Sequence, residues 1–322
     1  MRRIAGRFLG AVVMSASLLG GKADGQVRQS ELSFSSGNLT LQGTLALPSG
    51  AGPWPAAVII AGSGPTDRDG NTMMGKTGTY AMVAAALAER GIASFRYDKR
   101  GLPSSKGSFD AASVTVHDFA ADAAAAAQML DARSDIGPVV FIGHSEGGLL
   151  ALLAAQKKAP VAGLVLVAAA GRDASTILRE QLSRQLPPPL LAQFDNAWAG
   201  YIKEGGEYTA PAGLEMLFVP ANRRFMQSWQ AADPVAILRG LALPTLVLQG
   251  ATDVQVTQDD ARALAGARSD VKLVVLPGVN HVLKEAAGAT AQEQMAAYTD
   301  PSLPLAPAVG KTLADWILTL RR

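Results

Sequence analysis

The stretch VVFIGHSEGGLLALL, residues 139–153, contains the pattern that decides the fold. An apolar run ends in the pentapeptide GHSEG, and a second apolar run follows directly. The first run predicts a buried strand, and the second predicts a helix that begins at Glu146. Ser145, held between glycines at such a junction, is either part of a tight turn or a nucleophile on a strained strand-to-helix turn. The rest of the chain favours the nucleophile.

The N-terminal residues 1–25 differ from the rest of the chain in composition. Three arginines precede an apolar run over residues 8–20, and small residues follow. This order is typical of a secretory signal peptide, and about 13 apolar residues are too few to span a bilayer, which needs ~20. We expect cleavage after Ala23 or Gly25 and export to the periplasm or the medium. An uncleaved anchor or a first helix is the alternative.

Composition and charge exclude several classes of protein. The chain is 48% hydrophobic and 17% charged, which suits a large buried core and not a disordered chain. Residues 1–25 contain four basic side chains and one acidic one, so the net charge of +2 becomes −1 without them. The sequence contains no basic stripe with interleaved aromatic residues, so nothing in it predicts a nucleic-acid partner. The absence of cysteine excludes disulfides, thiolate metal sites, a cysteine nucleophile and a lipoprotein anchor.

Short apolar segments alternate with helical patterns along most of the chain. This alternation predicts a mostly parallel sheet with helices on both faces, an α/β architecture in a single domain over residues 26–322. The expected strands cover residues 31–36, 39–47, 56–61, 92–98, 138–142, 161–169, 244–250 and 271–278. The expected helices cover residues 78–90, 113–131, 257–266 and 306–321, besides the helix that begins at Glu146.

The alternation breaks at residues 171–235, which we call the lid segment. Its sequence predicts helices punctuated by prolines, inserted over the sheet. Large apolar side chains gather in it, and they are the candidates for contact with a substrate: Trp198, Phe218, Phe225, Met226 and Trp229.

A serine hydroxyl needs a general base to act as a nucleophile, and the chain offers only three histidines. His144 is adjacent to Ser145, but neighbours on a sharp turn point apart, which predicts a packing role. His117 begins an alanine-rich helix, where a solvated or capping role is expected. His281 follows the strand expected at 271–278, and loops beyond the carboxyl ends of the strands surround the active-site crevice of such sheets. His281 is therefore the predicted base.

The base in turn needs a carboxylate to orient it and to stabilise its cation. Asp253 follows the strand expected at 244–250 and is the predicted acid, with a loop-capping role as the alternative. Asp259 and Asp260 are interpreted as charges at a helix N-terminus, and Asp233 as the start of another helix.

An oxyanion also requires two backbone N–H donors. We expect one from Glu146, the residue after the nucleophile, and the other from the loop that follows the strand at 56–61. In that loop Gly62-Ser63-Gly64 permits close approach of the backbone, and Ser63 is the predicted donor. A plain glycine turn is the alternative.

With these motifs in place, the sequence resembles the α/β-hydrolases over nearly all of the chain after residue 26. The resemblance rests on GHSEGG, on QGATDVQV around Asp253, on PGVNHV around His281, and on RYDKRGLPSSKG, residues 96–107. Together with AGSGPTDRDGN, these motifs are similar to bacterial carboxylesterases of the dienelactone hydrolase and acyl-peptidase branch. In that family a His-Gly pair usually precedes the oxyanion residue, whereas Ala61-Gly62 stands here. In the segment RYDKRGLPSSKG, Pro103 stands where the family's Asp-x-Arg-Gly-x-Gly-x-Ser loop has its second glycine.

Two features of these motifs stay open on sequence grounds. The charged residues Asp67, Arg68 and Asp69 form either an internal ion-pair network or contacts to a polar part of a substrate. The side chain of Glu146 either influences His281 or pairs with an arginine.

The resemblance implies a serine carboxylesterase that acts on small-molecule esters, without a metal or organic cofactor, a nucleic-acid partner or a stable membrane span; it implies no oligomeric state. The same triad serves a serine peptidase or amidase, a thioesterase or a lactonase. Epoxide hydrolases and dehalogenases would need a carboxylate in place of Ser145. A noncatalytic binding module on a hydrolase scaffold is the alternative from another class.

Overall fold

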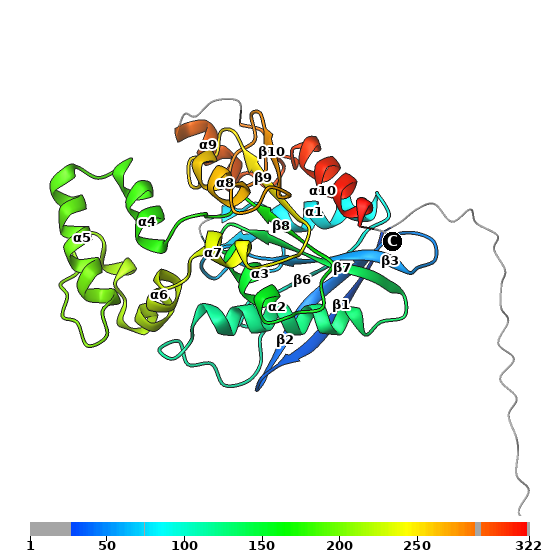
Figure 1. Ribbon diagram of the computed structural model, residues 1–322, viewed down its shortest axis with the longest axis horizontal. Coiled ribbons are helices and arrows are strands. Elements are labelled where there is room, and N and C mark those ends of the chain that lie inside the picture. Colours follow the sequence, from blue (N-terminus) through cyan, green and yellow to red (C-terminus); the bar gives the residue numbers. More distant parts are fainter. Residues whose placement is uncertain (1–26, 74, 287–290, 321–322) are drawn as a thin grey trace, which may run out of the picture.

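The computed structural model describes residues 27–73, 75–286 and 291–320, and the predicted signal peptide lies outside them. An eight-stranded sheet runs through the centre of the molecule in the order β1-β2-β6-β3-β7-β8-β9-β10 (Figure 1). The strands are β1 (Arg28–Ser36), β2 (Leu39–Leu47), β3 (Trp54–Ile60), β6 (Ala93–Tyr97), β7 (Ile136–His144), β8 (Gly163–Val167), β9 (Thr245–Gly250) and β10 (Lys272–Leu276).

The first two strands run antiparallel to their neighbours, and all pairs from β6 to β10 are parallel. This arrangement confirms the expected mostly parallel sheet. Because all these parallel strands end at the same edge, the loops that follow β3, β7, β8 and β9 are brought together there.

Alternation of side chains along the strands divides the core into two layers. Val58 and Ile60 of β3 face one layer, and Ala57 and Ile59 face the other, as the period of two in a strand requires. The first layer contains α2 (Val116–Asp131), α3 (Glu146–Gln156) and α8 (Gln258–Ala265). The second contains α1 (Thr79–Ala88) and α10 (Pro307–Thr319). Helices therefore cover both faces, and the expected helices are confirmed within a few residues.

Two elements were not expected from the sequence. The small hairpin β4 (Asn71–Thr72) and β5 (Gly75–Lys76) follows the charged loop, and α9 (Ala291–Thr299) contacts β5. Strands of two residues show no alternation, and the α9 sequence AQEQMAAYT has no continuous apolar face. Neither element therefore produces the periodic pattern from which secondary structure is predicted.

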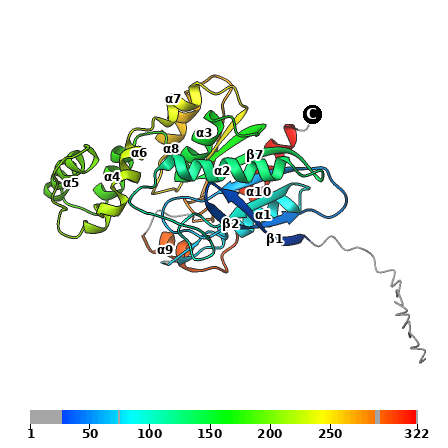
Figure 2. The ribbon, with the colours of Figure 1, turned by 90° about the horizontal axis from the view of Figure 1, so that it is seen from below.

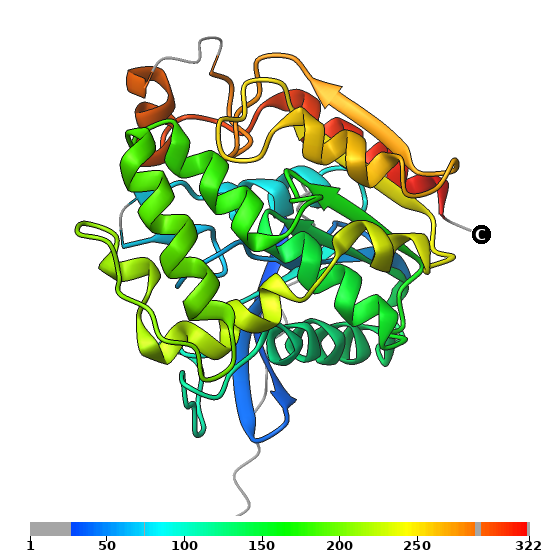
Figure 3. The same cartoon turned by 60° about the vertical axis from the view of Figure 1, so that its left-hand side comes forward.

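The lid segment joins β8 to β9 and projects from one end of the sheet in both Figure 1 and Figure 2. Figure 3 shows its two long helices, α4 and α5, side by side. The elements between β8 and β9 are α4 (Ala174–Ser183), α5 (Pro188–Ile202), the short 3₁₀ turns η1 (Glu215–Leu217) and η2 (Pro220–Asn222), α6 (Arg223–Gln230) and α7 (Pro234–Arg239).

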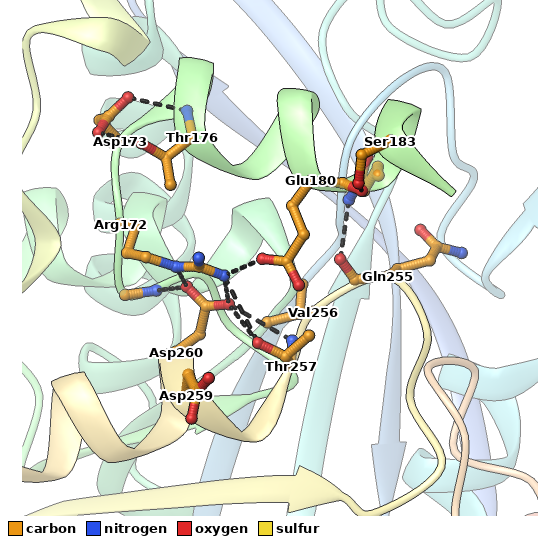
Figure 4. A network of polar contacts seen from close by, with 12 residues as sticks. Arg172, Asp173, Thr176, Glu180, Ser183, Gln255, Val256, Thr257, Asp259 and Asp260 are labelled. Atoms are coloured by element: carbon orange, nitrogen blue, oxygen red, sulfur yellow. Dashed lines mark hydrogen bonds and ion pairs between the residues drawn. The ribbon is translucent and has the colours of Figure 1, made fainter. Parts of the chain in front are cut away.

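A polar network ties the base of the lid segment to helix α8 (Figure 4). The guanidinium of Arg172 donates to Asp260 of α8 at 2.6 and 2.9 Å and to Glu180 of α4 at 2.5 Å. Asp260 is fully buried and also accepts from the backbone N–H of Gly171 at 3.0 Å. Asp260 thus does more than supply charge to a helix N-terminus, because it anchors the first residues of the lid segment.

Among the residues that the structure describes, no helix is both long enough and apolar enough to cross a bilayer.

Candidate active site

The loop between β7 and α3 holds Ser145 in a strained conformation. Its φ of 55° and ψ of −123° place a non-glycine residue at positive φ. A Cβ on Gly143 would lie 2.3 Å from the carbonyl oxygen of Gly147, and one on Gly147 would lie 2.3 Å from that of Ile60. Glycine is therefore required on both sides of the serine, and the strained turn holds the serine at the carboxyl edge of the sheet, at the start of α3.

His281 and Asp253 form a direct hydrogen bond. The Nδ1 of His281 lies 2.8 Å from Oδ2 of Asp253, although the two residues are 28 positions apart in the sequence. A carboxylate accepts only, so Nδ1 carries the proton and Nε2 is left as the basic nitrogen. His281 and Ser145 line the same cavity. The structure thus brings together the three residues that the sequence nominated as a triad.

The environment of Asp253 keeps it ionised. Burial alone would raise the pKa of this carboxyl, but the attraction of His281 and the hydrogen bonds it accepts lower the pKa below its usual value. The donors, besides His281, are the backbone N–H groups of Gln255 at 2.7 Å and Val256 at 3.0 Å. Both backbone groups donate to Oδ1, and the side-chain amide of Gln249 donates to Oδ2, the oxygen that His281 also binds, at 3.1 Å. The loop-capping interpretation is thus also correct, because the same carboxylate caps its own loop and holds His281.

His144 is buried beside the serine and held by two hydrogen bonds, in line with the packing role expected of it. Its Nε2 lies 2.8 Å from the carbonyl oxygen of His281, and its Nδ1 lies 2.9 Å from the hydroxyl of Tyr80. A carbonyl only accepts, so Nε2 carries the proton and Nδ1 accepts from Tyr80. The oxygen of Tyr80 in turn accepts from the backbone N–H of Gly62 at 2.9 Å. Burial, together with repulsion from His281, lowers the pKa of His144 to about 3, so this ring stays neutral.

The predicted oxyanion donors lie on either side of Ser145. A Cβ on Gly62 would lie 3.2 Å from the Cβ of Ser145, so the Gly62-Ser63 loop runs directly past the nucleophile. Because Tyr80 already accepts the N–H of Gly62, the next amide along the chain, that of Ser63, remains the predicted donor. Ser63 and Glu146 both line the cavity that holds Ser145 and His281.

The side chain of Glu146 pairs with a lysine, where the sequence had suggested an arginine or an influence on His281. Its Oε1 accepts from Nζ of Lys99 at 3.0 Å, and both side chains are buried. Lys99 also donates to the carbonyl oxygen of Gly62 at 2.9 Å. Lys99 could not be singled out from the sequence, since its only signal was its place in the motif YDKRG.

The charged loop after β3 is an internal ion-pair network. Arg68 donates to the carboxylate of Asp98 at 2.6 and 2.9 Å and also pairs with Glu31. Asp69 accepts from Arg96 at 2.7 Å. Asp67 accepts from backbone N–H groups of its own loop. These side chains therefore shape the loop that carries Ser63, which decides between the two interpretations left open by the sequence.

Two cavities meet at Ser63, Glu146, Met226 and Trp229. The catalytic cavity, of about 340 Å³, contains Ser145 and His281, and its outer wall has uncharged polar side chains, among them Thr66, Gln181 and Gln255. A second cavity, of about 330 Å³, lies between the loop after β6 and helix α6. We call it the apolar chamber, because its wall includes Leu102, Phe109, Val114, Phe119, Phe225, Met226 and Trp229.

Three of the five lid candidates line these cavities and two do not. Met226 and Trp229 contact both cavities, and Phe225 lines the apolar chamber. Trp198 and Phe218 are instead buried inside the lid segment, where their rings lie 6.3 Å apart. The sequence could not separate these groups, because an apolar side chain that packs within a lid looks the same as one that faces a substrate.

The remaining candidates lie away from Ser145. His117 is exposed on α2, and Asp233 caps α7 by accepting from the backbone N–H of Ala236 at 2.9 Å. Asp259 is an exposed residue at the start of α8, in the first turn as expected. No group of three or more acidic or histidine side chains within the described residues is arranged to hold a metal ion.

The mostly parallel sheet with helices on both faces, the strained serine and the histidine–aspartate pair together make up an α/β-hydrolase fold. Residues 72–200 match the family described as serine aminopeptidase, S33. The chain is also 30% identical over 249 residues to the esterase EstD of Thermotoga maritima, an alignment that covers 76% of this chain and 58% of EstD. The chain thus spans less than two thirds of the length of that relative.

Solved structures show the same fold. Est1E from Butyrivibrio proteoclasticus is 16% identical, with a TM-score of 0.57 over 90% of this chain and 98% of Est1E. Proline iminopeptidase from Mycobacterium smegmatis is 17% identical, with a TM-score of 0.60 over 90% of this chain and 98% of the other. One of these structures is named as a peptidase. The likeness therefore shows the fold only, and the substrate class has to be inferred from the residues of the site.

Proposed function

We propose that this protein is a serine carboxylesterase that forms an acyl-enzyme on Ser145. The observation that carries the proposal is the strained Ser145 in one cavity with His281, whose Nδ1 is held by Asp253 at 2.8 Å. The nucleophile, the base and the carboxylate that orients the base are the groups that acyl transfer by serine requires. The identity with EstD supports an ester as the substrate.

In the proposed reaction, Oγ of Ser145 forms a bond to the ester carbonyl carbon while its proton passes to Nε2 of His281. The π electrons of the carbonyl move to oxygen, and the backbone N–H groups of Ser63 and Glu146 stabilise this oxyanion. The tetrahedral intermediate collapses and breaks the bond to the alcohol oxygen, which takes the proton from His281. Water then attacks the acyl-enzyme in the same way and releases the acid and Ser145.

The charges around the cavities favour an ester over a peptide with a free N-terminus. An aminopeptidase must bind the ammonium group of its substrate, and a carboxylate is the usual partner for a cation in such a site. Glu146 is the single carboxylate among the described residues that line either cavity, and it is already paired with Lys99. A substrate ammonium would therefore lose its hydration without gaining a partner.

The apolar chamber favours a substrate with an apolar group next to the ester. Its charged residues are internally compensated, because Lys99 pairs with Glu146 and Arg100 pairs with Asp122 at 2.7 Å. An apolar acyl or alkyl group that enters the chamber would contact aromatic and aliphatic side chains from the lid segment and the loop after β6. Its transfer from water contributes ~25 cal/mol per Å² of buried surface.

A labelling experiment with a fluorophosphonate tests the nucleophile. We expect covalent modification of the folded protein at Ser145, and none in Ser145→Ala. A wild-type protein that folds but does not label would contradict the proposal and favour a noncatalytic binding module.

A substrate panel then separates the reaction classes. The panel contains p-nitrophenyl esters of increasing acyl length beside alanine and proline p-nitroanilides. We expect turnover of the esters and at least ~10²-fold lower kcat/KM on the anilides, since an unpaired buried ammonium is strongly unfavourable. A preference for the aminoacyl anilides would instead establish an aminopeptidase. Thioester and lactone substrates in the same panel test the remaining alternatives, which use the same triad.

We also propose that the protein is exported and that residues 1–25 are removed, on the strength of the arginines and the short apolar run in the sequence. Expression of the full chain in a bacterial host, followed by fractionation and N-terminal sequencing, tests this proposal. A mature protein in the cytoplasm that begins at Met1 would contradict it.

A further inference from the structure

The ammonium group of Lys99 contacts the peptide group that carries one predicted oxyanion donor and the side chain of the residue that carries the other. The residue follows β6, and only 6% of its surface is exposed. Its Nζ donates to the carbonyl oxygen of Gly62 at 2.9 Å and to Oε1 of Glu146 at 3.0 Å, and it lies 4.9 Å from the centre of the Phe119 ring. These partners come from three different segments of the chain.

The bond to Gly62 fixes the direction of the first donor. The carbonyl of Gly62 and the N–H of Ser63 belong to one trans peptide group, in which the two bonds point in opposite directions. A donor that holds the carbonyl therefore also sets where the Ser63 N–H points. Tyr80 holds the preceding N–H, that of Gly62, at 2.9 Å. The peptide on each side of Gly62 is thus restrained, and the Gly62-Ser63 peptide cannot turn over without breaking the bond to Lys99.

The bond to Glu146 restrains the second donor. Glu146 is the first residue of α3, and its own backbone N–H is the amide predicted to face the oxyanion. Its side chain is buried and held by Lys99, so the residue is anchored on the same cation that holds the Gly62 carbonyl. The two donors approach the oxyanion from different loops, and the contacts of Lys99 fix their relative position.

We propose that Lys99 and Glu146 are positioning residues that align the two backbone donors of the oxyanion hole. A buried ion pair is weak support for stability, because apolar residues of similar volume are often as stable. Packing alone, however, would not hold the carbonyl of Gly62, since a buried carbonyl needs a directed donor. Lys99 supplies this directed donor, and the charge of Glu146 neutralises that of Lys99 beside the apolar chamber.

The test rests on the proposed esterase reaction and uses p-nitrophenyl acetate, with a wild-type rate measured first. In Lys99→Met we expect kcat to fall ~10- to 100-fold. This loss is smaller than the 10²–10³-fold loss that follows deletion of an oxyanion donor, because both donors are still present. KM should stay within about twofold of wild type, because the contacts to the bound substrate remain. A trifluoromethyl ketone, which forms a tetrahedral adduct with Ser145, should lose affinity by the same factor as kcat. If Lys99 only stabilised the fold, kcat and the affinity for the ketone would not fall by the same factor.

The matched control is Lys284→Met. Lys284 is also a buried lysine, 1% exposed, whose Nζ donates to a backbone carbonyl, that of Asp300 at 2.9 Å, but it touches neither oxyanion donor. We expect its kcat and ketone affinity to stay within about twofold of wild type. Equal losses in the two variants, or an unchanged ketone affinity in Lys99→Met, would overturn the proposal while leaving the esterase activity of the wild type intact.

Two further measurements keep the test decisive if Lys99→Met folds poorly. Because the chain has no cysteine, Lys99→Cys can be alkylated with 2-bromoethylamine in the unfolded state, which restores an ammonium group of nearly the same length. After refolding, recovery of kcat relative to the unalkylated variant supports the proposal, and no recovery, with wild type refolded in parallel, contradicts it. In a double-mutant cycle, the variant with both Lys99→Met and Glu146→Gln should lose no more kcat than Lys99→Met alone. Fully additive losses of kcat would instead show two independent roles and contradict the proposal.

Discussion

The loops at the carboxyl edge of the sheet are joined by directed hydrogen bonds, whereas the interior of the lid segment is filled by packed aromatic rings. In the loops, directed hydrogen bonds join distant segments, such as Tyr80 to His144 at 2.9 Å and His144 to the carbonyl of His281 at 2.8 Å. In the lid segment, aromatic rings pack on one another, as where Tyr201 lies 5.3 Å from Phe218. Directed bonds fix the distance and angle between the atoms they join, whereas packing fixes volume and tolerates changes of shape. Substitutions in the loops should therefore change kcat, and those in the lid segment should change stability or KM.

The largest expected effect distinguishes His281 from His144, the two histidines whose rings lie 4.8 Å apart beside Ser145. His281→Ala should lower kcat by at least ~10⁴-fold, the scale seen when a triad member is lost. His144→Gln, whose amide can replace both hydrogen bonds of the ring, should cost at most ~10²-fold through misplacement of the loops. Initial rates on p-nitrophenyl acetate measure both. Equal losses would mean that His281 has been wrongly assigned as the base.

The pH dependence offers a second check on the same pair. Because burial lowers the pKa of His144 to about 3, this ring is neutral throughout the range from pH 5 to 9. The pH–rate profile of His144→Gln should then have the same shape as that of the wild type over this range. A shifted inflection in the variant would show that His144 titrates or controls the titrating group.

The next effect is on stability and lies in the lid segment. Trp198 is buried among Phe194, Tyr201 and Phe218, away from both cavities. Trp198→Ala should lower the free energy of unfolding by ~3–5 kcal/mol through lost burial and a residual cavity. Urea denaturation measures the loss. A change below about 1 kcal/mol would show that this aromatic packing contributes little to the fold.

A smaller effect is expected on substrate preference. Phe225 lines the apolar chamber, so Phe225→Ala should raise KM about tenfold for p-nitrophenyl esters with long acyl chains, since the lost contacts are worth ~1–2 kcal/mol. The acetyl group offers a single methyl for contact with the chamber, so the acetate ester should keep its KM. A uniform change across chain lengths would argue that the chamber does not receive the substrate.

The smallest effect concerns the start of the lid segment. Asp173 caps α4 by accepting from the backbone N–H of Thr176 at 3.0 Å and binds Gln230 of α6 at 3.0 Å. Burial would raise the pKa of Asp173, but hydrogen bonds from Ser175, Thr176 and Gln230 lower it well below the usual value. A lowered folded-state pKa stabilises the protein above about pH 4, the pKa of the unfolded chain, and this contribution is lost as the pH falls further.

Asp173→Ala should therefore destabilise the protein by ~1 kcal/mol at pH 7, the usual value of an N-cap, and by less at pH 3. Urea midpoints at the two pH values measure the difference. A destabilisation that does not shrink in acid would show that the charge of Asp173 contributes nothing.

The elements predicted from the sequence are those with a local cause. The strand before Ser145 and the helix after it follow from apolar runs and from two glycines that no other residue can replace. Asp253 and His281 could be nominated because each follows a strand whose end must lie at the same edge of the sheet. Lys99 could not be nominated, since its pattern is that of an ordinary charged residue after a strand, and its burial depends on a loop 37 positions earlier and on a helix 47 positions later.

The sequence by itself determined the α/β architecture and the strained turn at Ser145, and it nominated Ser145, Asp253 and His281 as nucleophile, acid and base, because periodicity and turn chemistry act over a few residues. The tertiary structure alone decided which lid residues face the cavities, that Asp67, Arg68 and Asp69 belong to an internal network, and that Glu146 pairs with Lys99. These outcomes depend on hydrogen bonds and burial between segments far apart in the chain. The free energy of a buried charge is set by the partner that folding brings to it, and no local pattern encodes that partner.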